Sequence, residues 1–354
     1  MKYYVIEGTP DGEYNAASKA REDVEKILIN QGYTSFYIPS IYGVQKNKLM
    51  KWKQFFVYRK NNSIWDKALS TLKKGDILYI QYPILNTASD IINVIKKHKD
   101  RGLKFVAIVH DMDSLRVKKE ESSAMLYKRI CKEDKYLLNE MDYIICHNSS
   151  MKKELVKLGN DPKKLIELKI FDYLLDFEPK KFKRTKKDPV IIAGNLSPYK
   201  AQYLTGLKNL KVKFNLFGVG FNDDVAGKNI SYKGKFKPDE LLNHLEGGFG
   251  LVWDGKSVDT IEGGFGNYLR YNNPHKVSLY LTAGIPVIVW KESALADYIE
   301  KNHLGIAVNN LNEIEEKINK LTEKEYNDIC DNIKAVSKKL RNGEFLKEAL
   351  NKIK

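Results

Sequence analysis

Cysteine is scarce in this chain of 354 residues, and long apolar runs are absent. The three cysteines, Cys131, Cys146 and Cys330, are scattered, odd in number and without the paired spacing of a zinc site. This pattern argues against a disulfide framework and fits a reducing compartment. No segment approaches about eighteen continuous apolar residues, and the first residues show no signal-peptide pattern. We therefore expect a cytoplasmic protein that does not span a membrane.

Acidic residues are too few to balance the basic ones, since 45 Asp and Glu stand against 60 Lys and Arg, a net charge of +15. Such a charge favours an anionic partner: nucleic acid, an acidic membrane leaflet or a phosphorylated substrate. Nucleic acid is the weakest of the three, because no RNP, zinc-finger or helix-turn-helix pattern accompanies the lysines. The densest basic run, residues 180–187, is interpreted as a solvated linker, with a membrane-surface contact as the alternative.

Strand-like and helical patterns alternate along both halves of the chain. Strands that are apolar throughout, separated by amphipathic helices, predict an α/β fold with parallel sheets covered on both faces. We predict two doubly wound, Rossmann-like domains facing a cleft, with ligands at the carboxyl ends of the strands. The expected parts are an N-terminal Rossmann-like domain (1–172), a basic linker (173–188), a C-terminal Rossmann-like domain (189–340) and a last helix (341–354) that packs back on the N-terminal domain.

The segment 247–289 contains a buried strand, a long polar loop, a helix start and a second buried strand. About twenty residues, from Asp254 to Asn273, lack apolar periodicity, which is typical of a functional or disordered loop. Asn272 or Asn273 is expected to cap the following helix, with Pro274 in its first turn. The free backbone N–H groups there, with the side chains of His275, Lys276 and Arg270, predict a cradle for a diphosphate. An ordinary capped helix start with a solvated lysine is the alternative.

Polar residues also follow strands of the first predicted domain. His110, Asp111 and Arg116 come after a strongly apolar strand, and Asp111 or His110 is a candidate general base for a sugar hydroxyl. The alternative is that Asp113 caps the next helix and His110 bonds to backbone. The turn Glu7 to Gly12 follows the first strand and offers backbone that a ligand can approach, or simply a tight turn.

In the second predicted domain, Asn195, Ser197 and Lys200 follow the first strand and Gly218 ends the second. They are candidates for binding phosphate or ribose, although the glycine can serve merely to turn the chain. Asp254 and Glu262 of the long loop would repel phosphate but suit sugar hydroxyls. No acidic pair is a convincing metal site, so diphosphate binding is expected to be metal-independent and to need no cofactor beyond the donor substrate.

Several motifs resemble one known family: EGGFGLVWDG, FGNYLRYNNPHK, SLYLTAGIPVIVW and HDMDSLR. They look like those of bacterial galactofuranosyltransferases of the GT-B type. The same C-terminal segment is also similar to glucosyltransferases that extend GlcNAc on serine-rich adhesins. The resemblance is strongest over residues 246–308 and thinner over the first domain.

The resemblance implies a UDP-sugar donor on the C-terminal domain and a glycan or glycolipid acceptor on the N-terminal one. It implies that Lys276 and the helix start at Asn273 to His275 hold the diphosphate, that residues 195–200 and Gly218 line the nucleotide pocket, and that a loop closes over the transferred sugar. That loop contains Gly8, Thr9, Asp11, Gly12 and Tyr14. Tyr271 and Leu279 stand where many retaining GT-B enzymes carry two glutamates, so ribose recognition and stereochemistry stay open.

The expected activity is transfer of galactofuranose from UDP-galactofuranose to a hydroxyl of a cell-surface glycan intermediate, by an enzyme that visits the inner face of the plasma membrane. One alternative is a UDP-glucose-dependent glucosyltransferase acting on a GlcNAc-modified adhesin. Another is a non-catalytic partner subunit that keeps the fold. An oligomer of identical chains is compatible with each of these.

Overall fold

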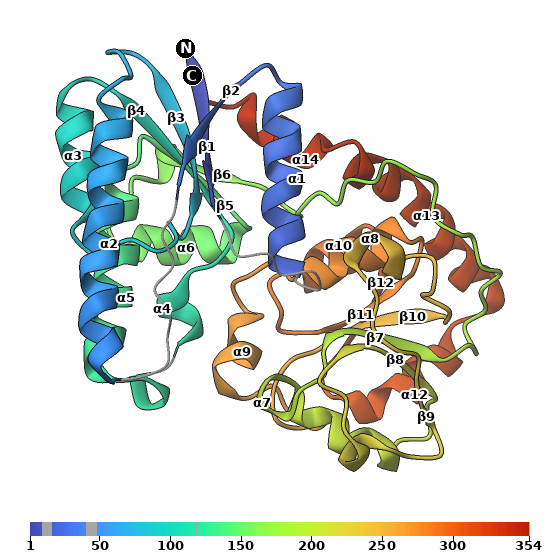
Figure 1. Ribbon diagram of the computed structural model, residues 1–354. Helices are drawn as coiled ribbons and strands as arrows, with labels where there is room; N and C mark the ends of the chain where they lie inside the picture. Colours follow the sequence, from blue (N-terminus) through green and yellow to red (C-terminus); the bar gives the residue numbers. More distant parts are fainter. Residues whose placement is uncertain (9–15, 40–47, 118, 354) are drawn as a thin grey trace.

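The chain folds into two parallel sheets, each flanked by helices (Figure 1). The computed structural model describes residues 1–8, 16–39, 48–117 and 119–353. Thr9, Asp11, Gly12 and Tyr14 of the predicted donor loop lie outside these ranges. No helix in the described part of the chain is both long and apolar enough to cross a bilayer.

The N-terminal sheet has six parallel strands in the order β2-β1-β3-β4-β5-β6. Its strand order reverses between β1 and β3, so a crevice for ligands is expected outside the carboxyl ends of these two strands. The strands are β1 (Lys2–Glu7), β2 (Thr34–Ile38), β3 (Ile77–Tyr82), β4 (Lys104–Val109), β5 (Tyr143–Cys146) and β6 (Leu165–Glu167). Its helices are α1 (Ala16–Asn30), α2 (Lys48–Leu69), α3 (Ile91–Asp100), α4 (Asp113–Arg116), α5 (Ala124–Lys132) and α6 (Ser149–Lys157), with a π-helical turn η2 (Glu133–Leu137) after α5.

The C-terminal sheet has the strand order β12-β11-β10-β7-β8-β9, which is the classic Rossmann order with its reversal between β7 and β10. Its strands are β7 (Val190–Asn195), β8 (Phe214–Val219), β9 (Ile230–Tyr232), β10 (Phe249–Val252), β11 (Val287–Trp290) and β12 (Gly305–Val308). Its helices are α7 (Pro198–Ala201), α8 (Pro238–Leu241), α9 (Gly263–Tyr268), α10 (His275–Thr282), α11 (Ala296–Lys301), α12 (Ile314–Lys320), α13 (Glu323–Arg341) and α14 (Glu344–Leu350). The two predicted doubly wound domains are therefore confirmed.

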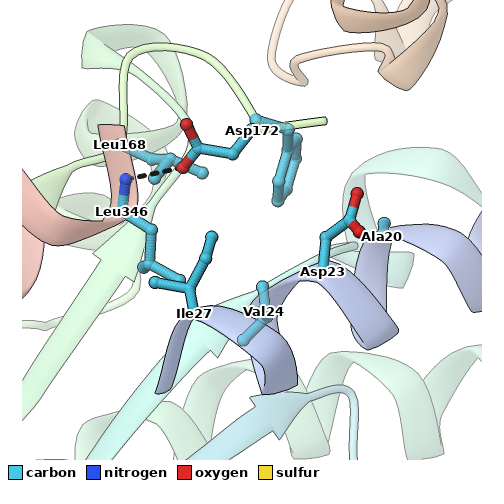
Figure 2. Close-up of a pocket in the computed structure, with 8 residues that line it drawn as sticks. Ala20, Asp23, Val24, Ile27, Leu168, Asp172 and Leu346 are labelled. Atoms are coloured by element: carbon cyan, nitrogen blue, oxygen red, sulfur yellow. Dashed lines mark hydrogen bonds between the residues drawn. The ribbon is translucent and has the colours of Figure 1, made fainter. Parts of the chain in front are cut away.

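The last helix, α14, lies against α1 of the N-terminal domain (Figure 1). Asp172, on the segment that leaves the N-terminal domain, accepts hydrogen bonds from the backbone N–H groups of Phe345 (3.1 Å) and Leu346 (2.8 Å) at the start of α14. Figure 2 shows Asp172 beside a cavity of about 10 Å³, which Asp23 of α1 also lines. A cavity of this size has room for one water molecule and none for a sugar nucleotide.

One apolar core is continuous across the domain boundary. It includes Ile27 of α1, Phe171 of the connecting segment, Val277 of α10, Ile333 of α13 and Phe345 of α14, all nearly inaccessible to solvent. Burying these side chains stabilises the placement of one domain against the other, as well as each domain by itself.

The long loop after β10 differs from the sequence-based expectation. It contains the short helix α9, and the buried Tyr268 at the end of that helix belongs to the apolar core of the N-terminal domain. The hydroxyl of Tyr268 accepts a hydrogen bond of 2.8 Å from the backbone N–H of Met112. Hydrophobic periodicity does not indicate this helix, because three of its six residues are glycine and have no side chain that could contribute to a pattern. The loop therefore forms a bridge between the two domains.

Candidate active site

The N-terminal side of the candidate site follows β4, where the chain turns into α4. Arg116, at the end of this short helix, lies 3.2 Å from an Asp111 oxygen and 2.5 Å from an Asp113 oxygen. Asp113 is the first residue of α4, and Met112 occupies the cap position, so the alternative reading of Asp113 as the cap is wrong. Burial raises the pKa of Asp111, and Arg116 partly offsets this effect. An ionised carboxylate with a raised pKa is a better general base than an ordinary one.

His110, the second candidate base, is already engaged. Its Nε2 lies 2.7 Å from the side-chain oxygen of Gln81, and its ring stacks on Phe171 with 5.6 Å between centroids. Burial lowers the pKa of His110 well below its usual range, so the imidazole stays neutral. Gln81 in turn donates to a carboxylate oxygen of Glu25 at 3.1 Å. His110 is therefore a neutral, buried side chain whose Nε2 is already hydrogen-bonded.

Sequence reasoning missed a buried polar group at the carboxyl end of β1. Arg21 of α1 lies 3.4 Å from a Glu7 oxygen and donates to the carbonyl oxygen of Pro83 at 2.7 Å. Burial raises the pKa of Glu7 to about 7, although the charge of Arg21 opposes part of this rise. Arg21 and Glu25 are four residues apart on α1, the helix that follows the first strand. Residues at this spacing share one face of a helix, and this pattern could have indicated both as members of the site.

The C-terminal side of the site lies where the strand order reverses, between β7 and β10. Lys276, in the first turn of α10, places its Nζ 3.0 Å from Asp254 Oδ1 and 3.4 Å from the carbonyl oxygen of Trp253. A Cβ built on Gly194, at the end of β7, would lie 3.3 Å from Lys276 Cε, so the lysine side chain crosses this strand end. The Lys276 side chain keeps 18% of its surface exposed. This position is suited to a diphosphate, since the helix N-terminus adds its own partial positive charge.

The cap of α10 corrects one expectation. Pro274 occupies the N-cap position and makes no side-chain cap bond, so neither Asn272 nor Asn273 caps the helix. Instead Asn273 is buried at the domain boundary: its Nδ2 donates to the carbonyl oxygens of His147 (2.8 Å) and Lys169 (3.1 Å), and its Oδ1 accepts from Asn148 Nδ2 (2.7 Å). The side chain of Asn273 thus holds the two domains together just before Lys276.

The backbone of Asn273 makes a further contact between domains. Its N–H donates to His147 Nδ1 at 2.9 Å, while His147 Nε2 lies 3.0 Å from the carbonyl oxygen of Val109. Burial lowers the pKa of His147 to about 4, so the ring is neutral and accepts through Nδ1. His147, Asn148 and Asn273, hereafter the domain joint, thereby set the position of α10 relative to β4.

Aromatic and cationic side chains meet where the two domains face each other. Phe265 of α9 lies under the Arg116 guanidinium (5.9 Å to the ring centroid) and under Lys200 Nζ (5.6 Å). Burial lowers the pKa of Lys200, with Lys276 and Arg116 adding to this effect and Asp254 opposing it. The charges of four side chains from both domains therefore act on Lys200: Lys276, Arg116, Asp111 and Asp254.

The remaining strand-end candidates have mixed placements. Asn195 is exposed and its side-chain oxygen accepts from the backbone N–H of Ser197 at 2.9 Å, while Ser197 occupies the N-cap position of α7. Gly218 lies beside Gly194, and its carbonyl oxygen accepts from the Tyr232 hydroxyl at 2.9 Å. These residues lie at the same sheet edge as Lys276.

Other predicted residues lie apart from this group. Arg270 packs over the Trp290 ring (4.4 Å to the centroid) and pairs with Glu292. His275 turns its ring toward Tyr173 and Phe171, with centroids 5.2 and 6.1 Å away. Glu262 is exposed at the N-cap position of α9, and the N–H of Gly8 lies 3.4 Å from the carbonyl oxygen of Ile38.

Among the described residues, no group of three or more His, Cys, Asp or Glu side chains is arranged to hold a metal ion. The cations that surround the candidate site are lysine and arginine side chains.

Comparisons with known proteins identify the family of the chain. Residues 2–170 match the family model "Glucosyltransferase 3-like, N-terminal domain", and residues 190–353 match the model of the C-terminal domain. The chain is 34% identical over 288 residues to the beta-1,6-galactofuranosyltransferase WbbI of Escherichia coli (strain K12), covering 80% of this chain and 81% of that protein. It is 26% identical to glucosyltransferase 3 of Streptococcus gordonii over 345 residues, covering 94% and 92% of the two chains.

Solved structures show the same fold at low sequence identity. Sucrose-phosphate synthase from Thermosynechococcus elongatus superposes with a TM-score of 0.65 at 12% identity, covering 98% of this chain and 96% of that one. The lipopolysaccharide outer core galactosyltransferase WaaB gives 0.59 at 13% identity, with 99% of both chains covered. Two Rossmann-like domains, a basic site at their boundary and family models over nearly the whole chain lead to one conclusion: the chain belongs to the glucosyltransferase 3-like family of GT-B glycosyltransferases.

Proposed function

We propose that this glycosyltransferase moves galactofuranose from UDP-galactofuranose to a hydroxyl of a cell-surface glycan intermediate. The observation that carries the proposal is the position of Lys276 at the β7/β10 strand-order reversal, where Lys276 and Asp111 of the other domain both act on the charge of Lys200. The galactofuranosyltransferase WbbI, at 34% identity over most of both chains, supports this choice of sugar.

On this proposal the C-terminal domain holds the donor. Lys276 and the N-terminus of α10 bind the diphosphate, and Lys200 and Arg116 add positive charge beside it. As the glycosidic bond breaks, negative charge develops on UDP, and fixed cations stabilise it without a metal ion. Asn195, Ser197 and Gly218 line the nucleotide, while Asp254 is placed to meet a sugar hydroxyl.

The role of Asp111 depends on whether the transfer inverts or retains the configuration at the anomeric carbon. In an inverting transfer the Asp111 carboxylate takes the proton of the acceptor hydroxyl while its oxygen attacks the anomeric carbon, and UDP leaves with the bonding electrons. A front-side, retaining transfer needs no such base. The contact of Asp111 with Arg116 suits the inverting mechanism, because it holds the carboxylate in place beside the site.

A donor panel tests the choice of sugar. Purified protein is incubated with UDP-galactofuranose, UDP-glucose, UDP-galactose and UDP-GlcNAc, and UDP release is measured. We expect release from UDP-galactofuranose to exceed the others at least tenfold. Activity confined to UDP-glucose would instead establish the second candidate, a glucosyltransferase acting on a GlcNAc-modified adhesin, which the similarity to glucosyltransferase 3 over 94% of this chain favours.

Nucleotide binding tests the diphosphate site separately. Lys276→Ala removes a charge-assisted hydrogen bond and is expected to weaken UDP binding by roughly 1.5 to 3 kcal/mol, measured by calorimetry. Lys301→Ala, which removes an exposed lysine in the last turn of α11, is the control and should leave the affinity unchanged. Wild-type protein that binds no UDP would support a non-catalytic partner subunit.

A further inference from the structure

One exposed face of the N-terminal domain carries large apolar side chains beside lysines. It runs along α5 and the following π-helical turn, whose buried residues include Ile130 and Leu137. Met125 is 84% exposed, Tyr136 49% and Leu126 46%. The exposed residues of this surface, hereafter the α5 face, are Met125, Leu126, Lys128, Lys132, Lys135 and Tyr136.

The positive charge of the α5 face is not neutralised nearby. Lys128, Lys132 and Lys135 form no ion pair with any residue that the structure describes. Of the carboxylates near α5, Glu133 is 2.7 Å from Arg129 and so is already paired, and Glu120 acts on Tyr127. An anionic surface is therefore the complementary partner for this face.

The amino-acid composition of the α5 face favours a lipid surface over a protein partner. Protein interfaces are depleted in lysine at their centres, because each lysine loses hydration and side-chain freedom on burial. At a bilayer surface, lysine side chains keep their charge among the headgroups while leucine, methionine and tyrosine enter the interfacial layer. Interleaved lysines and apolar side chains on one short helical face match the second case.

The basic linker, which the sequence indicated as the alternative membrane contact, is occupied by its own domain. Arg184 donates to the carbonyl oxygen of Gly247 at 2.6 Å, and Lys186 donates to that of Leu321. Phe182 lies between Lys180 and Arg184, 4.7 and 5.2 Å from their charged groups. Of the large apolar side chains of the linker, Phe177 is exposed, at 36%, whereas the α5 face presents three such side chains that are 46% exposed or more.

The α5 face also lies close to the candidate acceptor side. Helix α4, which carries Arg116, contacts α5 on one side and α9 of the C-terminal domain on the other (Figure 1). We infer that the α5 face docks this enzyme on an anionic lipid bilayer. The inference goes beyond the proposed transfer reaction and does not depend on which sugar is transferred. Docking there would bring β4 and Asp111 near a membrane-linked acceptor.

Vesicle co-sedimentation tests this inference with the full chain. Vesicles of phosphatidylcholine with 30 mol% phosphatidylglycerol are compared with phosphatidylcholine alone, at low and at physiological salt. We expect wild-type protein to sediment only with the anionic vesicles. Lys128→Gln with Lys132→Gln should weaken binding about thirtyfold, since each surface lysine contributes about 1 kcal/mol. Met125→Ser with Leu126→Ser should also weaken it, by about tenfold or more.

The control variant is Lys181→Gln with Lys183→Gln, which removes the same charge from two exposed lysines of the linker. A control that loses binding as strongly as the α5 variant overturns the inference, as does wild-type protein that ignores anionic vesicles. Wild-type protein could instead be a dimer that binds no vesicles. If Met125→Ser with Leu126→Ser then makes it monomeric, the α5 face is an interface between copies of this chain and the inference is overturned. UDP affinity measured on the α5 variants should match wild type, which separates this test from the donor site.

Discussion

Asp111 is the residue whose chemistry the inverting mechanism depends on most. Asp111→Asn keeps the shape and removes the base, so the turnover rate should fall by about 10² to 10⁴ while UDP affinity stays near wild type. Because burial raises the pKa of Asp111, the acidic limb of the rate profile should lie above the ordinary aspartate range near about 4. Rates measured from pH 4 to 8 check both points. A variant with undiminished transfer would rule out Asp111 as the base.

Asp254 competes with phosphate for Lys276. Its carboxylate lies 3.0 Å from the lysine Nζ and only 13% of its side chain is exposed, so the pair is well shielded from water. Asp254→Asn should leave the lysine charge free and tighten UDP binding by about tenfold, or about 1.4 kcal/mol. The same change should slow transfer, because a sugar contact is weakened. Calorimetry with UDP is the measurement; weaker binding would mean that Asp254 mainly orients Lys276.

Single residues were predicted unevenly from the sequence. Lys276, Asp111, Arg116 and Lys200 were indicated because charged residues after apolar strands come together at one sheet edge, and the structure brings them together. Arg270 was included for its charge alone, but the Trp290 ring and Glu292 lie within its reach on the neighbouring strand end. The spacing of residues along the chain does not show that Trp290 and Glu292 compete with a ligand for Arg270.

At the scale of elements, the β7 and β8 ends approach each other so closely that Gly218 tolerates no side chain. Its φ is +141°, and a Cβ there would lie 1.7 Å from the Gly194 carbonyl oxygen. Gly218→Ala should lower the free energy of unfolding by about 2 to 4 kcal/mol, from strain and overpacking together. Gly284→Ala, with φ of +72° and open space around it, is the control and should cost about 1 to 2 kcal/mol in urea unfolding. Equal losses would contradict the close approach.

Helix and strand boundaries followed local signals where these were strong. Helix α13 begins and ends at local signals, because Thr322 and Glu325 form a capping box and Asn342 follows its basic last turn. Strand β12 has no such signal, since four residues between two helices carry too little periodicity to predict a strand. It exists because the edge of β11 supplies its backbone partners, which no local pattern reports.

The whole molecule contains buried carboxylates that link its stability to pH. Burial raises the pKa of Asp172 from its ordinary value near 3.8 to about 7, so the folded state holds this proton more tightly than the unfolded chain. Its contribution to stability is therefore complete below about pH 4 and is lost as the pH rises through about 7. In Asp172→Asn, which has no proton to lose, this loss is absent.

Urea unfolding at pH 5 and pH 7.5 checks this prediction. Relative to Asp172→Asn, wild-type protein should lose about 1 to 2 kcal/mol of stability between the two values. Asp176→Asn, which changes a carboxylate that is 91% exposed on the same segment, is the control. A difference between wild type and Asp172→Asn that is the same at both pH values would contradict the raised pKa.

By itself the sequence determined the two α/β domains, their parallel strands and the charged residues at the strand ends, because apolar periodicity and strand-end chemistry are local properties. Only the tertiary structure decided how the domains meet. The domain joint, the bridge through Tyr268 and the packing of α14 on α1 join residues more than a hundred positions apart. Such contacts depend on the shapes of two folded surfaces, and no spacing along the chain records them.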